Sequence, residues 1–488
     1  MGIIIKQSIK GSIWSYSGIV IGFITTSFLF PRYLSTDTIG LFSILLSYSI
    51  LFAQFSALGF HGVTSRLFTY FRDKEKGHNG YFFLAFAVML TGFLLLSLVF
   101  FFVKPVIVEN NLEKSKLFAE YVYLLLPITL FTLLFVQLDM INKVLYDAVL
   151  GAFLQEFLQR LLIFTVTVLF IFGVFNLHQL ILAYAVVVCV KGLFMFLYLL
   201  VKGEMSFQPR FKFIDKKLRK EIIDVALFSI LTGLGGSIVF NIDKIIINQI
   251  LGLGQTGVYT IAFFFGTLVV IPSRPLLRIS GTLIADAFKR KDLDYIFDIY
   301  RRSCINQFII GAFLFGGIWI NIGNILEILG PEYADGKWVI FFIGLAYLFD
   351  MATGANGQII SFSPHYRFAL YFVLVLVVLV VITMYIFVPV YGIMGGAIAI
   401  AVSIFANNIM RFLFLKIKYK MQPFNLSFLT VALIFTAAYF ITLLIPEMKL
   451  IPDILIRSTV FSVLAVAAVY LTGVSDDMNS MVKKFLRK

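Results

Sequence analysis

The sequence predicts an all-α protein that crosses a membrane about fourteen times, with two six-helix halves followed by two extra helices. Three observations predict this architecture. Hydrophobic residues make up 60% of the 488 positions and charged residues only 14%, and the mean hydropathy of +0.97 lies far above that of water-soluble domains. Apolar runs follow one another along nearly the whole chain. The N-terminal hairpin also recurs in the middle of the sequence.

Each predicted span is an apolar run of about 20 residues, the length that an α-helix needs to cross the hydrocarbon core. The connections between several neighbouring runs are too short to form a domain, so the helices are expected to pair as antiparallel hairpins. The fourteen predicted spans are 11–30, 38–60, 81–103, 118–140, 148–173, 178–201, 224–250, 256–272, 303–322, 336–356, 368–388, 391–414, 427–445 and 455–472.

The recurrence of the hairpin indicates an internal repeat. An offset of 217 positions carries residues 12–44 onto 229–261 without a gap, and eight of the thirty-three pairs are identical. Gly40 falls on Gly257, at the start of the second helix of each hairpin. Because six spans per half is an even number, both halves keep the same orientation, and a pseudo-two-fold axis along the membrane normal is expected.

The repeat and the charge pattern divide the chain into four parts. We expect six-helix lobes over 1–201 and 224–414, a basic cytoplasmic linker over 202–223, and two extra spans with a basic tail over 415–488. The two extra spans are expected to carry no charge within the membrane and to face lipid.

Lysine and arginine predict the orientation, because cytoplasmic loops are enriched in them. With the N-terminus in the cytoplasm, 30 of the 40 basic residues fall inside, 7 fall outside, and Arg160, Lys191 and Lys244 fall within spans. Both termini are therefore predicted to be cytoplasmic. The net charge of +14 follows from this topology. Nucleic-acid binding is not expected, because the sequence shows no soluble domain that could carry a basic face.

A polar stripe in the fifth predicted span contains Gln155, Glu156, Gln159 and Arg160 at helical spacing. A charged side chain near the centre of a span costs roughly 2.5–3.5 kcal/mol on insertion scales, so it usually meets a partner or a water-filled cavity. Glu156 and Arg160 can neutralise each other and fix helix packing. They can equally line a cavity, and the sequence leaves both interpretations open.

Other polar side chains of the predicted spans are also candidates for a site. Lys191 is near the middle of the sixth span, and facing the interior is the favoured interpretation. The seventh span carries a stripe of Asn241, Lys244 and Asn248, with Asp243 beside it. Asp350, in the tenth span, could bind a coupling cation, as could Asp243 and Glu156, or it could simply meet water at the end of its helix. The candidate cytoplasmic mouth consists of Arg66, Arg274 and Arg278.

The sequence shows no catalytic constellation. Its four histidines are not at metal-ligand spacing from one another, its two cysteines are far apart, and no phosphate-binding loop for ATP is present. The external loops are too short to hold an active site. We therefore expect no enzyme activity, no cofactor and no metal.

Short motifs near the start of each half resemble those of a known family. The first half contains Gly11-Ser12 with Trp14, and Arg32-Tyr33-Leu34 followed by Gly40-Leu41-Phe42. The second half contains Asn241-Ile242-Asp243-Lys244 followed by Gly257-Val258-Tyr259. Together they resemble the polysaccharide-flippase (Wzx-type) branch of the MOP (multidrug/oligosaccharidyl-lipid/polysaccharide) exporter superfamily. The early basic cluster expected of the related lipid II flippase is missing, because the first basic residue after Lys10 is Arg32.

The resemblance implies a MATE-like fold and a function. The family moves undecaprenyl-pyrophosphate-linked oligosaccharide from the inner to the outer leaflet of the bacterial cytoplasmic membrane by alternating access. Arg160, Lys191 and Lys244 would supply cations for the pyrophosphate, with Gln159, Asn241 and Asn248 as polar cavity groups. Membrane lipids, a polysaccharide polymerase and a chain-length regulator would be partners.

Two alternatives belong to other functional classes. A cation-coupled multidrug exporter of the same fold would favour a cavity dominated by carboxylates. A membrane-embedded glycosyltransferase or polymerase would need a sizeable catalytic segment outside the membrane, which the sequence does not show.

Overall fold

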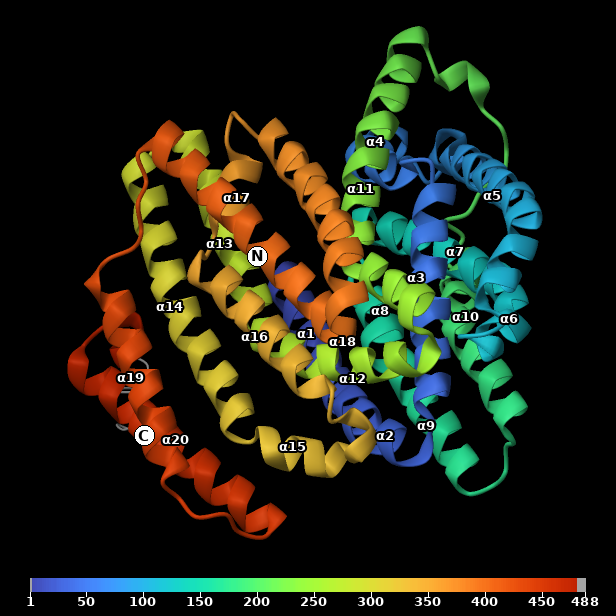
Figure 1. Ribbon diagram of the computed structural model, residues 1–488. Helices are drawn as coiled ribbons and strands as arrows, with labels where there is room; N and C mark the ends of the chain where they lie inside the picture. The colour runs from blue at the N-terminus through green and yellow to red at the C-terminus, as the bar shows by residue number, and fades with distance from the viewer. Residues whose placement is uncertain (1, 481–488) are drawn as a thin grey trace. The chain divides into compact units, whose positions relative to one another are not determined.

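The computed structural model describes residues 2–480, and within that range the chain forms helices and no strand (Figure 1). The helices and their bounds are α1 Gly2–Ile24, α2 Phe30–Tyr33, α3 Thr36–Ser56, α4 Phe60–Phe71, α5 Tyr81–Asn111, α6 Lys116–Tyr121, α7 Leu125–Val144, α8 Val149–Ala152, α9 Gln159–Ile171, α10 Leu177–Val201, α11 Lys216–Leu251, α12 Leu253–Thr267, α13 Ser273–Arg290, α14 Leu293–Ile320, α15 Ile322–Leu329, α16 Gly336–Ala352, α17 Asn356–Phe362, α18 Arg367–Tyr419, α19 Leu426–Leu443 and α20 Leu450–Thr472. Two segments are π-helical, η1 Thr25–Leu29 and η4 Phe153–Leu158.

Twelve helices of the described range are long and apolar enough to cross a membrane, and the bent pair of α16 and α17 can add a thirteenth. α18 counts once among the twelve although it has 53 residues and a non-helical Gly392 inside it. An unbroken helix of that length would measure about 80 Å, against about 30 Å of hydrocarbon. α18 is therefore two spans, whose orange limbs can be followed in Figure 1. This brings the total to fourteen and confirms the predicted architecture.

The chain divides into two compact units, which we call the first unit (1–257) and the second unit (258–488). The apolar core of the first unit lies between α4, α5, α7 and α10, with Phe68, Phe82 and Leu138 fully buried. The core of the second unit lies between α13, α14 and α17, with Ile284, Tyr300 and Ile359 fully buried.

The 217-residue offset holds for the bounds of the helices well beyond the hairpin that revealed it. α3 begins at Thr36 and α12 at Leu253, which are 217 positions apart. The offset carries α10 (177–201) to 394–418, where the second limb of α18 runs from Gly392 to Tyr419. Six consecutive spans therefore recur with almost no insertion or deletion, as two copies of one six-helix plan require.

The second span is interrupted in the first unit and its equivalent is interrupted in the second. α3 stops at Ser56, and Leu58 and Gly59 take positive φ values of 47° and 73° before α4 begins. In the second unit a 3-10 turn follows α12, and Pro272 and Pro275 flank the start of α13. Glycine in the left-handed region and proline both disrupt helical hydrogen bonding, which explains why each span changes direction there.

The first turns of α3 and α12, both within the first unit, cross at two glycines that the offset makes equivalent. A Cβ atom on Gly40 would lie 2.2 Å from the carbonyl oxygen of Leu253, and one on Gly257 would lie 2.0 Å from that of Thr36. Thr36 and Leu253 are themselves equivalent, so the contact is reciprocal. Only glycine permits so close a crossing.

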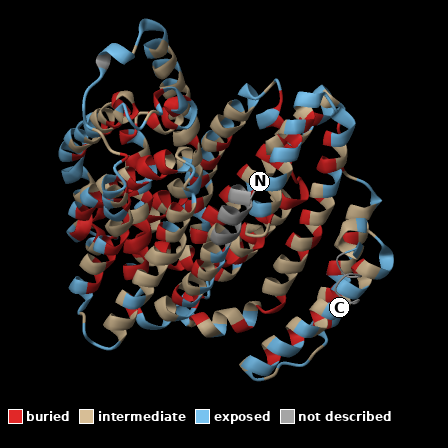
Figure 2. Cartoon of the chain, turned by 180° about the vertical axis from the view of Figure 1, so that it is seen from behind, coloured by how far each residue is buried: buried red, intermediate tan, exposed pale blue. Residues whose placement is uncertain are grey.

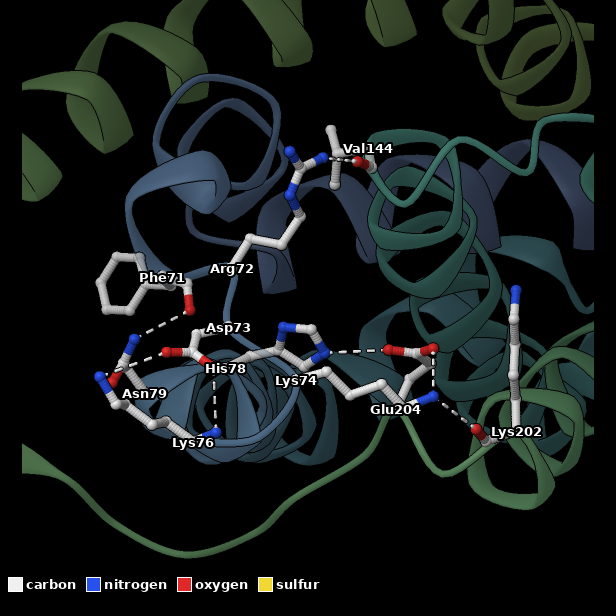
Figure 3. Close-up of polar contacts among 10 residues, drawn as sticks. All are labelled: Phe71, Arg72, Asp73, Lys74, Lys76, His78, Asn79, Val144, Lys202 and Glu204. Carbon is white, nitrogen blue, oxygen red and sulfur yellow. Dashed lines mark hydrogen bonds and ion pairs between the residues drawn. The ribbon is translucent and has the colours of Figure 1, made fainter. Parts of the chain in front are cut away.

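The segment after α10 is anchored to the first unit by Glu204 (Figure 3). Its carboxylate accepts hydrogen bonds from Lys74 Nζ at 2.8 Å and from His78 Nε2 at 3.0 Å. Burial alone raises the pKa of Glu204, but the hydrogen bonds from Lys74 and His78 outweigh burial and hold it below its ordinary value. The first part of the predicted linker over 202–223 is therefore held in place by Glu204, and we call residues 203–210 the strap. From Lys216 onward the predicted linker is part of α11.

The last two helices correct one expectation. Along α19 and α20 buried residues recur on one face (Figure 2). Asp453 and Arg457 of α20 are buried and form an ion pair of 2.8 Å, so the expectation of no charge within these spans is wrong. Asn324 also donates to Asp453 at 2.6 Å, and Arg457 donates to the Ile445 carbonyl at 2.9 Å. Further hydrogen bonds to both members of the pair help to offset the cost of burying it.

A candidate functional site in the first unit

The candidate site lies where α1 packs against η4 and α9. η1 and η4 are the two π-helical segments of the described range, and such segments occur frequently at functional sites because they redirect side chains. The approach is very close, since a Cβ atom on Gly18 would lie 1.7 Å from the backbone oxygen of Glu156. Gly18 and Gly22 therefore present a flat surface to the helix that carries Glu156 and Arg160.

Glu156 and Arg160 form an ion pair across this surface. Arg160 donates to Glu156 Oε2 at 2.8 Å, and about a third of each side chain remains exposed. The guanidinium lies over Gly22, where an added Cβ atom would be 3.1 Å from it. Gln159 is partly buried one position before Arg160. The geometry satisfies the pair and still leaves it accessible, so it is compatible with both interpretations drawn from the sequence.

Three further charges join this pair. Lys191, in α10, interacts electrostatically with Glu156 and with Asp139 of α7, and its Nζ lies 5.0 Å from the ring centroid of Phe135. Asp139 is buried and forms an ion pair with Lys143. We call Asp139, Lys143, Glu156, Arg160 and Lys191 the charged cluster. It holds three cations and two carboxylates, which leaves one net positive charge.

The stripe of α11 is engaged in contacts of its own. Lys244 Nζ lies 3.4 Å from Asp243 Oδ1, and the Asp243 side chain is almost fully buried. Asn241 donates to the Ser237 carbonyl one turn away. Asn248 is buried, donates to Asn111 at 3.0 Å and accepts from Ser115 at 2.8 Å. Asn248 therefore ties α11 to the end of α5, and a substrate-binding role for this stripe stays a prediction.

The three arginines predicted at the cytoplasmic mouth are exposed. Arg66 lies on α4 with its guanidinium 5.6 Å from the ring centroid of Phe228. Arg274 and Arg278 project from the exposed face of α13 in the second unit, one helical turn apart.

The second unit holds a different polar group around Asp350. Asn408 donates to Asp350 Oδ1 at 2.8 Å, and the Asn408 oxygen accepts from Thr353 at 2.9 Å and from Asn356 at 3.0 Å. We call these four residues the amide cluster. It could hold a cation only if the amide oxygens turned toward it. Within residues 2–480 no group of three or more His, Cys, Asp or Glu side chains is arranged to hold a metal ion.

Sequence reasoning paired Glu156 with Arg160 and grouped Arg160 with Lys191 as cations for the pyrophosphate, but it did not connect Asp139 with them. The missing signal is the repeat, because the offset of 217 carries Asp139 onto Asn356 and Lys191 onto Asn408. Both positions are polar in both halves and fall within predicted spans. The recurrence of polar residues at these two positions could have indicated that Asp139 and Lys191 belong to one site.

The model of the family described as polysaccharide biosynthesis protein matches residues 8–283. This match covers 276 of the 488 residues, more than half of the chain. The chain belongs to the polysaccharide biosynthesis protein family. The match includes every residue of the charged cluster and the predicted mouth arginines Arg274 and Arg278, so the family assignment and the candidate site rest on the same part of the sequence.

Solved structures share the fold of this family member. A structure of the lipid II flippase MurJ in an inward closed conformation is similar with a TM-score of 0.76 at 15% identity, over 95% of this chain and 98% of that one. An inward-facing multidrug resistance MATE family transporter of the MOP superfamily is similar with a TM-score of 0.65 at 19% identity, over 83% and 94%. Among curated protein sequences, none matches the chain. The fold is that of MOP-superfamily transporters, and the protein is a multi-pass membrane protein.

Proposed function

We propose that this protein is a flippase that moves undecaprenyl-pyrophosphate-linked oligosaccharide repeat units from the inner to the outer leaflet of the bacterial cytoplasmic membrane. The observation that carries the proposal is the charged cluster, with its net positive charge on three neighbouring predicted spans of a polysaccharide biosynthesis family member. Both termini are cytoplasmic in this proposal, as the distribution of Lys and Arg predicts.

The physical need for such a cluster comes from the substrate. A pyrophosphate with attached sugars cannot enter hydrocarbon without losing its hydration, which costs far more than any single contact returns. A guanidinium can replace water with two parallel hydrogen bonds to phosphate oxygens, and ammonium groups can add point charges. Arg160 would fill the first role and Lys191 the second. Glu156 holds the guanidinium in place until the phosphate competes for it.

A mechanism of alternating access fits the interrupted spans. The breaks at Leu58-Gly59 and at Pro272 give each half a place where one span can bend. A polysaccharide polymerase and a chain-length regulator would then act on the exported repeat units as functional partners.

The amide cluster favours one second candidate, a cation-coupled exporter of small molecules with the same fold. Its single carboxylate, Asp350, is held by neutral amides and could exchange a proton or a sodium ion. In the flippase proposal the same group would couple transport of the saccharide to an ion.

The proposal is tested in cells that lack the protein. Expressing the intact chain should restore surface polysaccharide and remove lipid-linked repeat units that accumulate in the inner leaflet. Resistance to cationic drugs without any change in lipid-linked saccharide would contradict the proposal and favour the exporter. A glycosyl-transfer product made by the purified protein would instead favour an enzyme.

A further inference from the structure

A cavity of about 360 Å³ lies between α13 and α14 in the second unit. α14 contributes one stripe of its surface, and α13 contributes Leu276, Ser280 and Leu283. The residues of the α14 stripe are Tyr295, Asp298, Ile299, Arg302, Ser303, Asn306 and Gln307. The volume is in the range of small-molecule sites, which combine apolar walls with a few placed polar groups. None of the charged-cluster residues lines it.

Gln307 gives this cavity an unpaired hydrogen-bond donor. The residue is only 1% exposed, yet its Nε2 group has no hydrogen-bond partner. A buried donor without a partner costs about 1–3 kcal/mol, so a ligand with an acceptor atom at that point would be stabilised. Asn306 differs, because it donates to Asp477 at 2.8 Å and accepts from Ser475 at 2.6 Å. Ser303 likewise donates to the Tyr300 carbonyl and accepts from the Ala355 amide.

The charges of the cavity point to a neutral ligand. Arg302 Nε lies 2.8 Å from Asp298 Oδ2, and a second contact joins Arg302 to Asp477 at 3.5 Å. Asp298 and Arg302 together bring no net charge to the wall of the cavity, whereas the charged cluster of the first unit has one net positive charge. A carboxylate and a guanidinium side by side can still accept from and donate to the hydroxyls of an uncharged ligand.

The remaining walls are apolar or aromatic. Leu276, Leu283 and Ile299 supply flat aliphatic contact, and Tyr295 supplies a ring, over which the guanidinium of Arg290 lies at 5.8 Å from the centroid. A sugar ring has an apolar face with hydroxyl groups around its edge, so it is complementary to these walls. Tyrosine suits such a ligand because its ring packs on the apolar face while its hydroxyl stays polar.

We propose that the cavity between α13 and α14 is a sugar subsite that holds one uncharged sugar ring of the saccharide, with Gln307 donating to a ring or hydroxyl oxygen. The inference rests on the proposed function for the source of the sugar. It assigns recognition of the neutral saccharide to the second unit, whereas the charged cluster of the first unit would hold the phosphates.

Photo-crosslinking in cells that make the polysaccharide tests this subsite. p-Benzoylphenylalanine replaces Leu283 at the rim of the cavity in the full-length chain, and the purified adducts are identified by mass and by periodate staining for sugar. We expect a sugar-containing adduct whose yield falls roughly fivefold when Gln307→Leu is added, which corresponds to loss of one neutral hydrogen bond. Gln358→Leu in α17, outside the cavity, is the matched control and should leave the yield unchanged.

The possible results distinguish a failure of the subsite from a failure of the proposed function. Adducts that contain only phospholipid, no adduct, or a sugar adduct that survives Gln307→Leu unchanged would overturn the subsite. Polysaccharide export by the unlabelled chain, measured in parallel, keeps the two proposals apart. If export is intact and the sugar adduct is missing, only the subsite fails. If the chain restores no export at all, the proposed function fails whatever the adducts are.

Discussion

The charged cluster of the first unit and the amide cluster of the second unit share two equivalent positions of one repeat. Asp139 and Lys191 correspond to Asn356 and Asn408 at the offset of 217. In the second unit the two asparagines bond directly at 3.0 Å, and together with Asp350 and Thr353 they form a closed network. In the first unit the corresponding residues are an acid and a base, and the base, Lys191, also interacts with Glu156.

The difference shows how one helical plan supports two chemistries. The amides of the second unit bond to each other, to Thr353 and to Asp350, so their main consequence is to hold α16, α17 and α18 together. Asp350 also interacts electrostatically with Arg411 of α18. Placing a charged side chain inside a membrane is energetically costly. The first unit nevertheless holds several such side chains, and about a third of the Arg160 side chain is exposed. In the proposed function, phosphate binding therefore falls to the first unit.

The largest expected effect follows from removing Arg160. Arg160→Ala should lower polysaccharide export about 30-fold, because a charge-assisted pair of hydrogen bonds to phosphate contributes about 2 kcal/mol. Arg160→Lys should retain part of the export, since lysine keeps the charge but loses the planar fork. Protein abundance is measured by immunoblotting of the membrane fraction.

Abundance separates binding from packing in this experiment. Binding predicts normal abundance for Arg160→Ala. If abundance falls and is restored by adding Glu156→Gln, the pair serves packing alone, and the assignment of phosphate binding to it is wrong.

A second experiment copies the chemistry of one unit into the other. The double variant Asp139→Asn with Lys191→Asn gives the first unit the pair of amides that the second unit carries. We expect normal abundance, because an asparagine pair is already tolerated at the equivalent position. The net charge of the cluster stays at plus one, so the expected fall in export, about tenfold, measures the loss of the Lys191 ammonium as a point charge for the phosphates. Unchanged export would show that charge at these positions has no part in transport.

Much of this comparison could be read from the sequence, but its central contacts could not. Hydrophobic length predicted all fourteen spans, because it depends on local composition. The fifth span could be marked as polar for the same reason. The predicted boundaries of the lobes stay a prediction, and the first compact unit extends to Gly257 and includes α11. The association of Lys191 with Asp139 and Glu156 depends on packing between α7, α9 and α10, which no spacing within one helix reveals. The buried ion pair of Asp453 and Arg457 was missed because Arg457, near the start of the last predicted span, was counted among the seven basic residues outside.

A third prediction tests the symmetry of the repeat at the crossing of α3 and α12. Gly40→Ala and Gly257→Ala should destabilise the protein to a similar degree, by about 1–3 kcal/mol, because each added methyl group meets an equivalent carbonyl oxygen. The measure is the thermal unfolding midpoint in detergent. Gly236→Ala is the control, since nothing lies within 4 Å of its added Cβ atom. Clearly unequal effects of the two variants would contradict a reciprocal contact.

The smallest expected effect concerns the strap at Glu204. Since its pKa is lowered in the folded protein, the anchoring contributes stability above the ordinary glutamate pKa and loses it as pH falls through the lower folded value. Amide hydrogen exchange over residues 203–210 should therefore stay protected from neutral pH down to about 4.5 and open below it. Glu204→Gln should raise exchange about tenfold at neutral pH. Protection that does not change in either case would show that this carboxylate does not hold the strap.

The most direct test of the central claim is flipping of a lipid-linked oligosaccharide by the purified protein in liposomes. The lipid carries either a pyrophosphate or a neutral linkage between prenol and sugar, and an added glycosidase reports which sugars have reached the outer leaflet. The charged cluster predicts flipping of the pyrophosphate form only, and its loss with Arg160→Ala but not with Gly236→Ala. Equal flipping of both lipids, or undiminished flipping by Arg160→Ala, would contradict the claim that the first unit binds the phosphates.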